Sequence, residues 1–583
     1  MKILLLHRED AANGGAWSQE PWDLIVDLGF AGPETYASCS QTLNSRILSI
    51  HQFARHPESY RGVNQLFERG RGRLLDRMGL DWWEILAMES YQDLHTLYLF
   101  RQLRRELHAG QIELAASRAH RATRIAEQVF GVPVRYMVPE DDGRLPRVMQ
   151  ALRSARKLRL AQITEIALDK WDSRYRFRRH FAKRAVARVT EPCLLLPSAY
   201  SNVTRSVLGY ASRLPHRKFL LITTRQNAAP DTTPANVTVG TLAAYVGTED
   251  PRRKDARLLQ DTWQALARQL QSEDEHFRTA AKAGVWDYFP AHLEHGLLLR
   301  DAWANVLQRE PVAGVLCGDD LNHHTRLPLI LANIQGLNAL YCSHGALDVG
   351  FLFKKAYADA FLVKGEMERD YLEQAAGIDR KKIFVGAPRY PRLVSPGSRT
   401  GQAIVYFSQP YEVAGGRGDS IYREIVPRLY SVAQATHRKL IIKLHPFESR
   451  SARHALVRSI LAGRDLDDVE ILDRVPAEQI FSRAWCGVTV DSSVAVEGAL
   501  VDIPFFLCGW LDFTGDGYLE QFVRFGVAQV LHTSADVERI PQMVSDFRPE
   551  PAKLQQVWRE ADSSQLDELM FGVPDVRCHP CVC

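Results

Sequence analysis

Short apolar runs that alternate with longer helical patterns restrict the fold of this 583-residue chain more than any other feature. The runs are continuous rather than alternating between apolar and polar residues. Continuous runs are expected of parallel strands whose two faces are both covered by helices. The pattern predicts an α/β fold built from Rossmann-like, doubly wound sheets. The expected strands lie at 3–6, 24–27, 134–138, 193–196, 219–223, 312–317, 339–342, 360–363, 383–385, 403–407, 440–443, 469–472, 487–490, 504–507 and 527–531.

Two domains are expected, because a segment rich in proline, glycine and serine at 391–401 has the composition of a linker. Residues 1–395 would form the first Rossmann-like domain. It would carry a helical insertion at about 81–190, since the long helical pattern that begins at 81 contains no proline up to 130. Residues 401–583 would form the second domain. Ligands of such sheets bind at the carboxyl ends of the strands, so we expect a site in a cleft between the domains.

The charge of the chain is unevenly distributed, although the net charge is only +4. Residues 144–188 contain fourteen Arg and Lys residues against three acidic ones, with aromatic residues interleaved. Such a segment could contact an anionic membrane surface or a polyanionic acceptor. It could equally be a solvated basic helix. Nothing else in the chain resembles a nucleic-acid-binding module, so we expect no nucleic-acid partner.

The start of the chain and its cysteines indicate a cytoplasmic protein. Only about four apolar residues precede His7, fewer than a secretory signal needs, and no run approaches the roughly 20 apolar residues of a membrane span. Nine cysteines in a chain of this length are no disulfide framework. Three of them and His579 lie within 578–583. Their spacing resembles one half of a zinc-binding motif, but the second group of ligands that such a motif needs is missing. We expect no folded zinc site there.

The segment IIKLHPFE, at 441–448, places a cation and an imidazole at the end of a buried strand. Lys443 and His445 would lie at the carboxyl edge of the sheet, and Pro446 would end the strand. This arrangement suits a phosphate group. The alternative is that His445 only caps a loop.

Two further strands of the second half end in polar residues. Ser492 and Ser493 fall at the start of a helix, where amide groups and the helix dipole favour an anion, and Glu497 follows one turn later. The alternative is an ordinary serine N-cap. Ser408 and Gln409 end the strand at 403–407 and precede a glycine-rich loop that lacks the P-loop lysine. We expect both to bind nucleotide, together with Lys443 and Pro446.

The order of these motifs, strand–SQP, strand–KxHP and strand–DSS–helix–E, resembles the nucleotide-binding half of bacterial surface-polysaccharide glycosyltransferases of the GT-B fold. In particular it is similar to those that carry an HP motif and use CMP-activated acidic sugars, such as Kdo transferases and sialyltransferases. The resemblance covers about 316–531 and implies a nucleotide site. His445 would contact the nucleotide phosphate or ribose, Ser492 and Ser493 the phosphate, and Glu497 the ribose. It implies no cofactor besides the CMP-sugar donor.

Carboxylates and a histidine end two strands of the first half. Asp319 and Asp320 follow the strand at 312–317, and His344 follows the next. A carboxylate there could act as base or as nucleophile, and the histidine could stabilise the leaving phosphate. Only one of the two neighbouring aspartates should face the cleft, and Asp320 is favoured. A divalent-metal site including His323 and His324 and a purely structural role are the alternatives, and no metal is expected.

These observations together lead us to expect a glycosyltransferase at the inner face of the cytoplasmic membrane. It would transfer Kdo, or a related ulosonic acid, from a CMP-activated donor to a glycan or glycolipid acceptor of lipopolysaccharide or capsule. The segment 144–188 would contact the membrane. A CDP-glycerol glycerophosphotransferase, a UDP-sugar 2-epimerase of the same fold and a non-catalytic scaffold remain alternatives.

Overall fold

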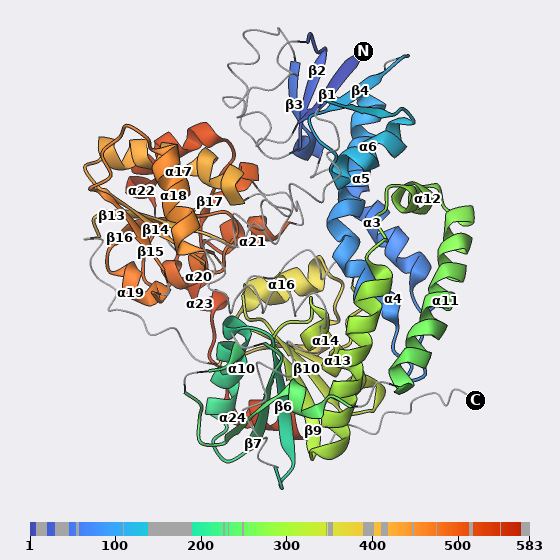
Figure 1. Cartoon of the computed structure of the whole chain (residues 1–583). Coiled ribbons are helices and arrows are strands. Elements are labelled where there is room, and N and C mark those ends of the chain that lie inside the picture. Colours follow the sequence, from blue (N-terminus) through green and yellow to red (C-terminus); the bar gives the residue numbers. More distant parts are fainter. Residues whose placement is uncertain are drawn as a thin grey trace, which may run out of the picture.

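The protein is built from three parallel β-sheets and the helices that flank them (Figure 1). The computed structural model describes residues 1–6, 20–28, 46–53, 57–108, 110–137, 189–225, 228–230, 232–247, 250–345, 347, 354–388, 401–409, 418–445, 448–473, 475–511, 517–547 and 550–572. The basic segment 144–188, the linker at 391–400, Pro446 and the cysteine-rich tail lie outside these residues.

Each sheet has the strand order of a doubly wound domain. The five-stranded sheet runs β3 (Arg46–Ser49), β2 (Leu24–Asp27), β1 (Lys2–Leu6), β4 (Glu113–Ala116), β5 (Val134–Tyr136). The seven-stranded sheet runs β12 (Ile383–Val385), β11 (Ala360–Val363), β10 (Asn338–Cys342), β9 (Val312–Cys317), β6 (Cys193–Ser198), β7 (Lys218–Thr223), β8 (Val237–Thr241). The six-stranded sheet runs β15 (Val469–Leu472), β14 (Lys439–Lys443), β13 (Ala403–Phe407), β16 (Ala484–Thr489), β17 (Phe505–Cys508), β18 (Gln529–Leu531).

The predicted α/β fold of parallel sheets is confirmed, and a strand is present at each expected position. The seven- and six-stranded sheets correspond to the two Rossmann-like halves expected of a GT-B protein. The structure differs from the expectation in the first 395 residues, which hold two sheets instead of one. β4 lies inside the stretch expected to be a helical insertion. It was not predicted, because its run of only four residues, ELAA, is too short to interrupt the helical pattern around it.

Helices cover the sheets and also form a separate helical region. In the first part of the chain they are α3 (Pro57–Gly70), α4 (Trp82–Leu86), α5 (Tyr91–Glu106), α6 (Arg121–Phe130), α10 (Ser201–Arg213), α11 (Asp250–Glu273), α12 (Glu275–Lys282), α13 (Phe289–Arg309), α14 (His323–Ile334) and α16 (Glu366–Gln374). Later helices are α17 (Gly418–Ala435), α18 (Arg450–Ile460), α19 (Ala477–Phe481), α20 (Val494–Ala499), α21 (Tyr518–Arg524), α22 (Ile540–Asp546), α23 (Pro551–Val557) and α24 (Ser563–Phe571). Short 3-10 helices are η3 (Ile50–Phe53), η4 (Ala87–Ser90), η6 (Leu242–Tyr245), η7 (Arg380–Lys382), η8 (Gly509–Leu511) and η9 (Ser534–Arg539).

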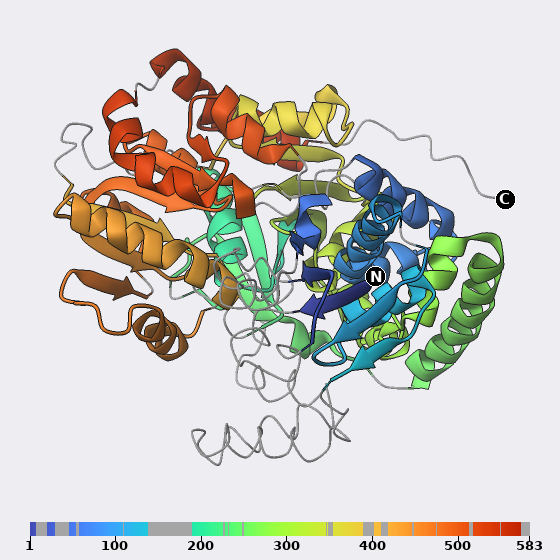
Figure 2. The same ribbon diagram turned by 90° about the horizontal axis from the view of Figure 1, so that it is seen from above.

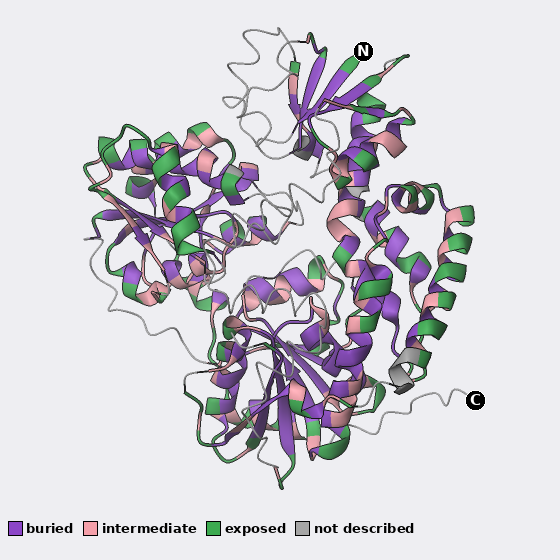
Figure 3. Cartoon of the chain, in the orientation of Figure 1, coloured by how far each residue is buried: buried purple, intermediate pink, exposed green. Residues whose placement is uncertain are grey.

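The three sheet domains are seen as separate bodies in Figure 1, whereas in the view of Figure 2 the five-stranded sheet overlaps the seven-stranded domain. The helical region formed by α3, α4, α11, α12 and α13 lies between the five- and seven-stranded sheets, and its core is aromatic. Trp83 and Trp263 are stacked with ring centroids 6.0 Å apart, and Trp263 stacks on Phe289 at 4.0 Å. Burial is concentrated in the sheets and on the inner faces of the helices (Figure 3).

The end of the described chain returns to the seven-stranded domain. Leu566 and Met570 of α24 are buried in one core with residues of β6 and β7. Arg217 donates to both carboxylate oxygens of Asp567, at 2.6 and 2.8 Å. The predicted second domain, 401–583, therefore contains a terminal helix that packs on the first. No helix among the described residues has the length and apolar character that crossing a bilayer requires.

Candidate active site

The predicted site residues gather at the carboxyl ends of central strands in two sheets. Ser408 and Gln409 follow β13, Lys443 and His445 follow β14, and Ser492 and Ser493 follow β16, and these three strands are neighbours in the order β14-β13-β16. Asp319 and Asp320 follow β9 and His344 follows β10, which are also neighbours. Each sheet therefore collects its own group of residues at one edge, as the sequence predicted.

Gln409 ties the ends of two strands together in the six-stranded domain. Its side-chain oxygen accepts from the backbone amide of Asp491 at 3.2 Å and from the hydroxyl of Thr489 at 3.4 Å. Its side-chain nitrogen donates to the carboxylate of Asp491. Gln409 thus shapes the edge at which Ser492 lies. Its contact with a nucleotide stays a prediction.

The loop that carries His445 is held by a buried carboxylate. Glu448 accepts from the backbone amide of His445 at 2.8 Å. Its other oxygen accepts from Arg453 at 2.8 Å and from the hydroxyl of Tyr422 at 3.1 Å. Glu448 is 8% exposed. The motif at 441–448 therefore contains its own positioning residue, to which the sequence analysis gave no role.

The charges around His445 and Lys443 show that the edges of the two sheets lie close together. Burial is the main reason why the pKa of His445 falls to about 4, and the positive charge of Lys443 and the neighbouring His344 add to this effect. Burial likewise lowers the pKa of Lys443. The carboxylates of Asp473 and Glu448 oppose this effect, and the guanidinium of Arg205 adds to it. His344 and Arg205 belong to the seven-stranded domain, whereas Lys443 and His445 belong to the six-stranded domain. Side chains of the two domains thus influence one another electrostatically.

Ser492 and Ser493 lie before α20, as predicted. The Ser492 hydroxyl accepts from the backbone amide of Val494 at 3.3 Å, so it caps the helix. Ser493 is the N-cap residue by position, with no side-chain capping bond. Glu497 lies within the first turn. α20 has only six residues, which limits the dipole that it can direct at an anion.

Asp319 joins the loop after β9 to the start of α10 at the edge of the seven-stranded sheet. Its carboxylate accepts from the hydroxyl of Tyr200, from the side-chain amide of Asn322, and from the backbone amide of Leu321 at 2.9 Å. It is 3% exposed. Tyr200 also packs edge-on against the ring of His344, with centroids 5.6 Å apart. Tyr200 and Asn322 were not among the predicted site residues, because their sequence positions suggest only helix caps.

His344 is oriented by a backbone carbonyl. Its Nδ1 lies 2.7 Å from the oxygen of Gly318, and a carbonyl oxygen can only accept, so Nδ1 carries the proton. In the neutral ring the lone pair is then on Nε2. Lys364 supports the turn around His344 by donating to Gly345 at 2.9 Å and to Ser343 at 3.2 Å. His344 is half-buried, unlike the two aspartates.

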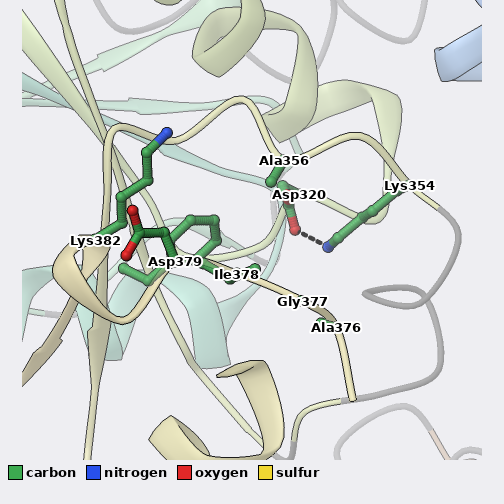
Figure 4. Close-up of a pocket in the computed structure, with 9 residues that line it drawn as sticks. Asp320, Lys354, Ala356, Ala376, Gly377, Ile378, Asp379 and Lys382 are labelled. Atoms are coloured by element: carbon green, nitrogen blue, oxygen red, sulfur yellow. Dashed lines mark hydrogen bonds and ion pairs between the residues drawn. The ribbon is translucent and has the colours of Figure 1, made fainter. Parts of the chain in front are cut away.

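Asp320 lies in a buried chain of alternating charges. Lys354 forms an ion pair with one of its oxygens, and Arg326 lies 3.4 Å from the other. Arg326 also lies 3.3 Å from Glu84 of α4, which in turn pairs with Arg71. Asp320 and Lys354 line a cavity of about 230 Å³, in which Figure 4 shows Lys354 directed at Asp320. The structure therefore places Asp320 where it joins the sheet to the helical region.

The comparisons with known proteins concern the fold alone. No family model matches the sequence, and no curated protein sequence matches it significantly. The UDP-GlcNAc 2-epimerase from Neisseria meningitidis bound to UDP-GlcNAc superposes with a TM-score of 0.40 at 10% identity, over 65% of this chain and 99% of that chain. The epimerase from Methanocaldococcus jannaschii gives 0.38 at 10% identity, over 65% and 98%. The calicheamicin glycosyltransferase CalG4 gives 0.36 at 12% identity, over 66% and 94%.

Proposed function

We propose that this chain is a glycosyltransferase that uses a nucleotide-sugar donor. The donor nucleotide would bind at the carboxyl edge of the six-stranded sheet, and the acceptor at the facing edge of the seven-stranded sheet. The observation that carries this proposal is the electrostatic proximity of His445 and Lys443 to His344 and Arg205. Four nitrogen-bearing side chains from two domains converge on a region that suits a phosphate.

For the donor we propose a CMP-activated ulosonic acid such as CMP-Kdo. Such a donor carries a phosphodiester and a sugar carboxylate, and so has two negative charges close together. Lys443 and Arg205 would supply one positive charge from each of the two domains. The proposed acceptor is a glycan or glycolipid of the cell surface, with the enzyme at the cytoplasmic face of the membrane. The proposed membrane contact, 144–188, rests on the sequence alone.

We assign the proton transfer to His344. It is the most exposed of the three predicted catalytic residues, and its Nε2 bears the lone pair. In the proposed reaction the acceptor oxygen forms a bond to the anomeric carbon and loses its proton to His344. The bond from that carbon to the phosphate oxygen breaks, and CMP leaves with the electron pair. Lys443 compensates the developing charge. Asp319 positions Tyr200 beside His344, and Asp320 has a structural role.

Binding of nucleotides tests the donor assignment. Isothermal titration with CMP, CDP, UDP and GDP should show a preference for CMP, weakened at least about 10-fold in Lys443→Ala and His445→Ala, which is about 1.4 kcal/mol. His532→Ala, an exposed residue outside the site, is the matched control. A preference for UDP would contradict the CMP assignment. Equal affinity of the variants would contradict the position of the site.

Transfer activity tests the reaction itself. With CMP-Kdo and an acceptor glycan, His344→Ala should lower kcat about 100-fold, the usual contribution of a general base, while the affinity for CMP changes little. Conversion of UDP-GlcNAc to its 2-epimer without acceptor would replace the proposal by the epimerase alternative. Turnover of CDP-glycerol would replace it by the glycerophosphotransferase. Unchanged activity in His344→Ala would remove this residue from the mechanism.

A further inference from the structure

Three histidine side chains meet at the junction of two helices, beside the candidate active site. His295 belongs to α13, and His323 and His324 form the first turn of α14. One ring nitrogen from each lies within 4.8 Å of those of the other two. The ring centroids are 4.7 Å apart for His323 and His324, and 5.4 and 5.6 Å from His295. This is the one such group of metal-ligating side chains among the described residues.

We propose that His295, His323 and His324 bind one divalent transition-metal ion, Zn²⁺ in the cell. Imidazole nitrogens are preferred ligands of zinc, and three histidines leave a fourth tetrahedral position for water. The nitrogens of such a site lie about 3.3 Å apart at Zn–N distances of about 2.0 Å. Metal binding would therefore bring the three nitrogens closer together than the present separation of up to 4.8 Å, by rotation of the rings about their side-chain torsions.

A carboxylate from a third element supports one of the rings. Glu89 of η4 lies 3.3 Å from Nδ1 of His323 through one oxygen. Its other oxygen lies 2.5 Å from Nδ1 of His292. A carboxylate on one ring nitrogen directs the other nitrogen, here Nε2 of His323, to the metal, as is common around zinc-bound histidines. Glu89 also brings a negative charge close to the ion.

The backbone of the site is already held in place. Asn322 caps α14 by accepting from the amide of His324 at 3.0 Å, and Trp303 of α13 donates to the carbonyl of His324 at 2.9 Å. His324 is 5% exposed. Such preorganisation lowers the cost of metal binding, because few torsions remain to be fixed.

The position of the site gives the metal a structural role. It would join η4, α13 and the start of α14. Asn322 directly precedes α14 and donates to Asp319. The ion would therefore fix the loop that carries Asp319, without entering the proposed glycosyl transfer. The inference holds whether or not the donor is CMP-Kdo.

Metal binding to the full-length protein tests the proposal. After removal of metal with a chelator, the protein should bind one equivalent of Zn²⁺, and Co²⁺ should give the intense visible absorption of a tetrahedral nitrogen site. His295→Ala and His324→Ala should lower zinc affinity at least about 100-fold, and Glu89→Gln about 10-fold, the range known for supporting residues. His454→Ala, on α18 of the other domain, should bind like the original protein.

A second set of variants excludes the cysteine-rich tail as the ligand. The triple variant Cys578→Ser, Cys581→Ser, Cys583→Ser should keep both the stoichiometry and the Co²⁺ spectrum. Circular dichroism of the metal-free variants checks that they fold. If His295→Ala does not fold, the zinc affinity of His323→Asn is measured in its place. The Co²⁺ spectrum of the original protein then still shows whether the metal is bound in a tetrahedral nitrogen site. Absence of stoichiometric binding, loss of binding in the tail variant, or unchanged affinity in the histidine variants would each overturn the proposal.

Discussion

The carboxylate of Glu448 accepts a 2.8 Å hydrogen bond from the backbone amide of His445, three residues earlier. The same carboxylate forms a buried ion pair with Arg453 of α18 at 2.8 Å. The loop that presents the imidazole is thus fixed to a helix of its own domain. The main chain of His445 is therefore held in a fixed position relative to α18.

Replacement of Glu448 should affect both stability and nucleotide binding. Glu448→Ala removes the buried carboxylate that pairs with Arg453 and leaves the more exposed Asp419 as its ion-pair partner, which should cost about 3 kcal/mol of unfolding free energy. Glu470→Ala, which removes a pair with Arg483 in which both side chains are about 40% exposed, should cost less than about 1 kcal/mol. Urea unfolding measures both, and CMP titration should show weakened binding only in the first. Equal losses of stability would contradict the role of Glu448.

The two neighbouring aspartates should respond differently to the same substitution. Asp320→Asn removes a negative charge between Lys354 and Arg326, both of which are buried, and should cost about 3 kcal/mol. Asp319→Asn keeps an acceptor for Tyr200 and should cost about 1 kcal/mol. Urea unfolding of the two variants side by side provides the comparison. The reverse order would show that Asp319, not Asp320, is the structural residue.

The stability of the protein should fall in mild acid partly through His445. Its pKa is about 4 in the native state because of burial, Lys443 and His344, against about 6.5 in an unfolded chain. Between these values the unfolded state binds a proton that the native state does not, so stability decreases as the pH falls. From pH 7.5 to 4.5 this amounts to about 2.5 kcal/mol. Urea unfolding at the two pH values measures this loss. The unfolding free energy of His445→Gln should fall by that much less than that of the original protein. The unfolding free energy of His532→Gln should fall as much as that of the original protein.

The return of α24 to the seven-stranded domain can be tested through Leu566, which is 2% exposed. Leu566→Ala should lower the unfolding free energy by about 3 kcal/mol, as is usual for a buried leucine. Leu258→Ala on α11, where the side chain is 65% exposed, should change it by less than about 0.5 kcal/mol. Thermal unfolding with a probe in each domain should show the loss in the seven-stranded domain. A loss in the six-stranded domain instead would contradict the packing.

The strands were predictable wherever an apolar run exceeded its surroundings in hydrophobicity. Val312–Cys317 and Ala360–Val363 are present with the expected bounds. β3 and β8 were missed because polar residues interrupt them, as in RILS and VTVGT. β4 was missed because a helical pattern surrounds its four residues. The strand order, which makes three sheets out of these runs, follows from long-range pairing that no local pattern encodes.

The sequence by itself determined the class of fold and the two groups of polar residues that follow strands, because strand ends and periodicity are local properties. Tertiary structure decided the rest. It separated Asp319 from its neighbour Asp320, since successive side chains point in different directions and find different partners 119 and 34 residues away, Tyr200 and Lys354. It also brought His295 to His323 and His324, because helix packing joins residues that the chain keeps apart.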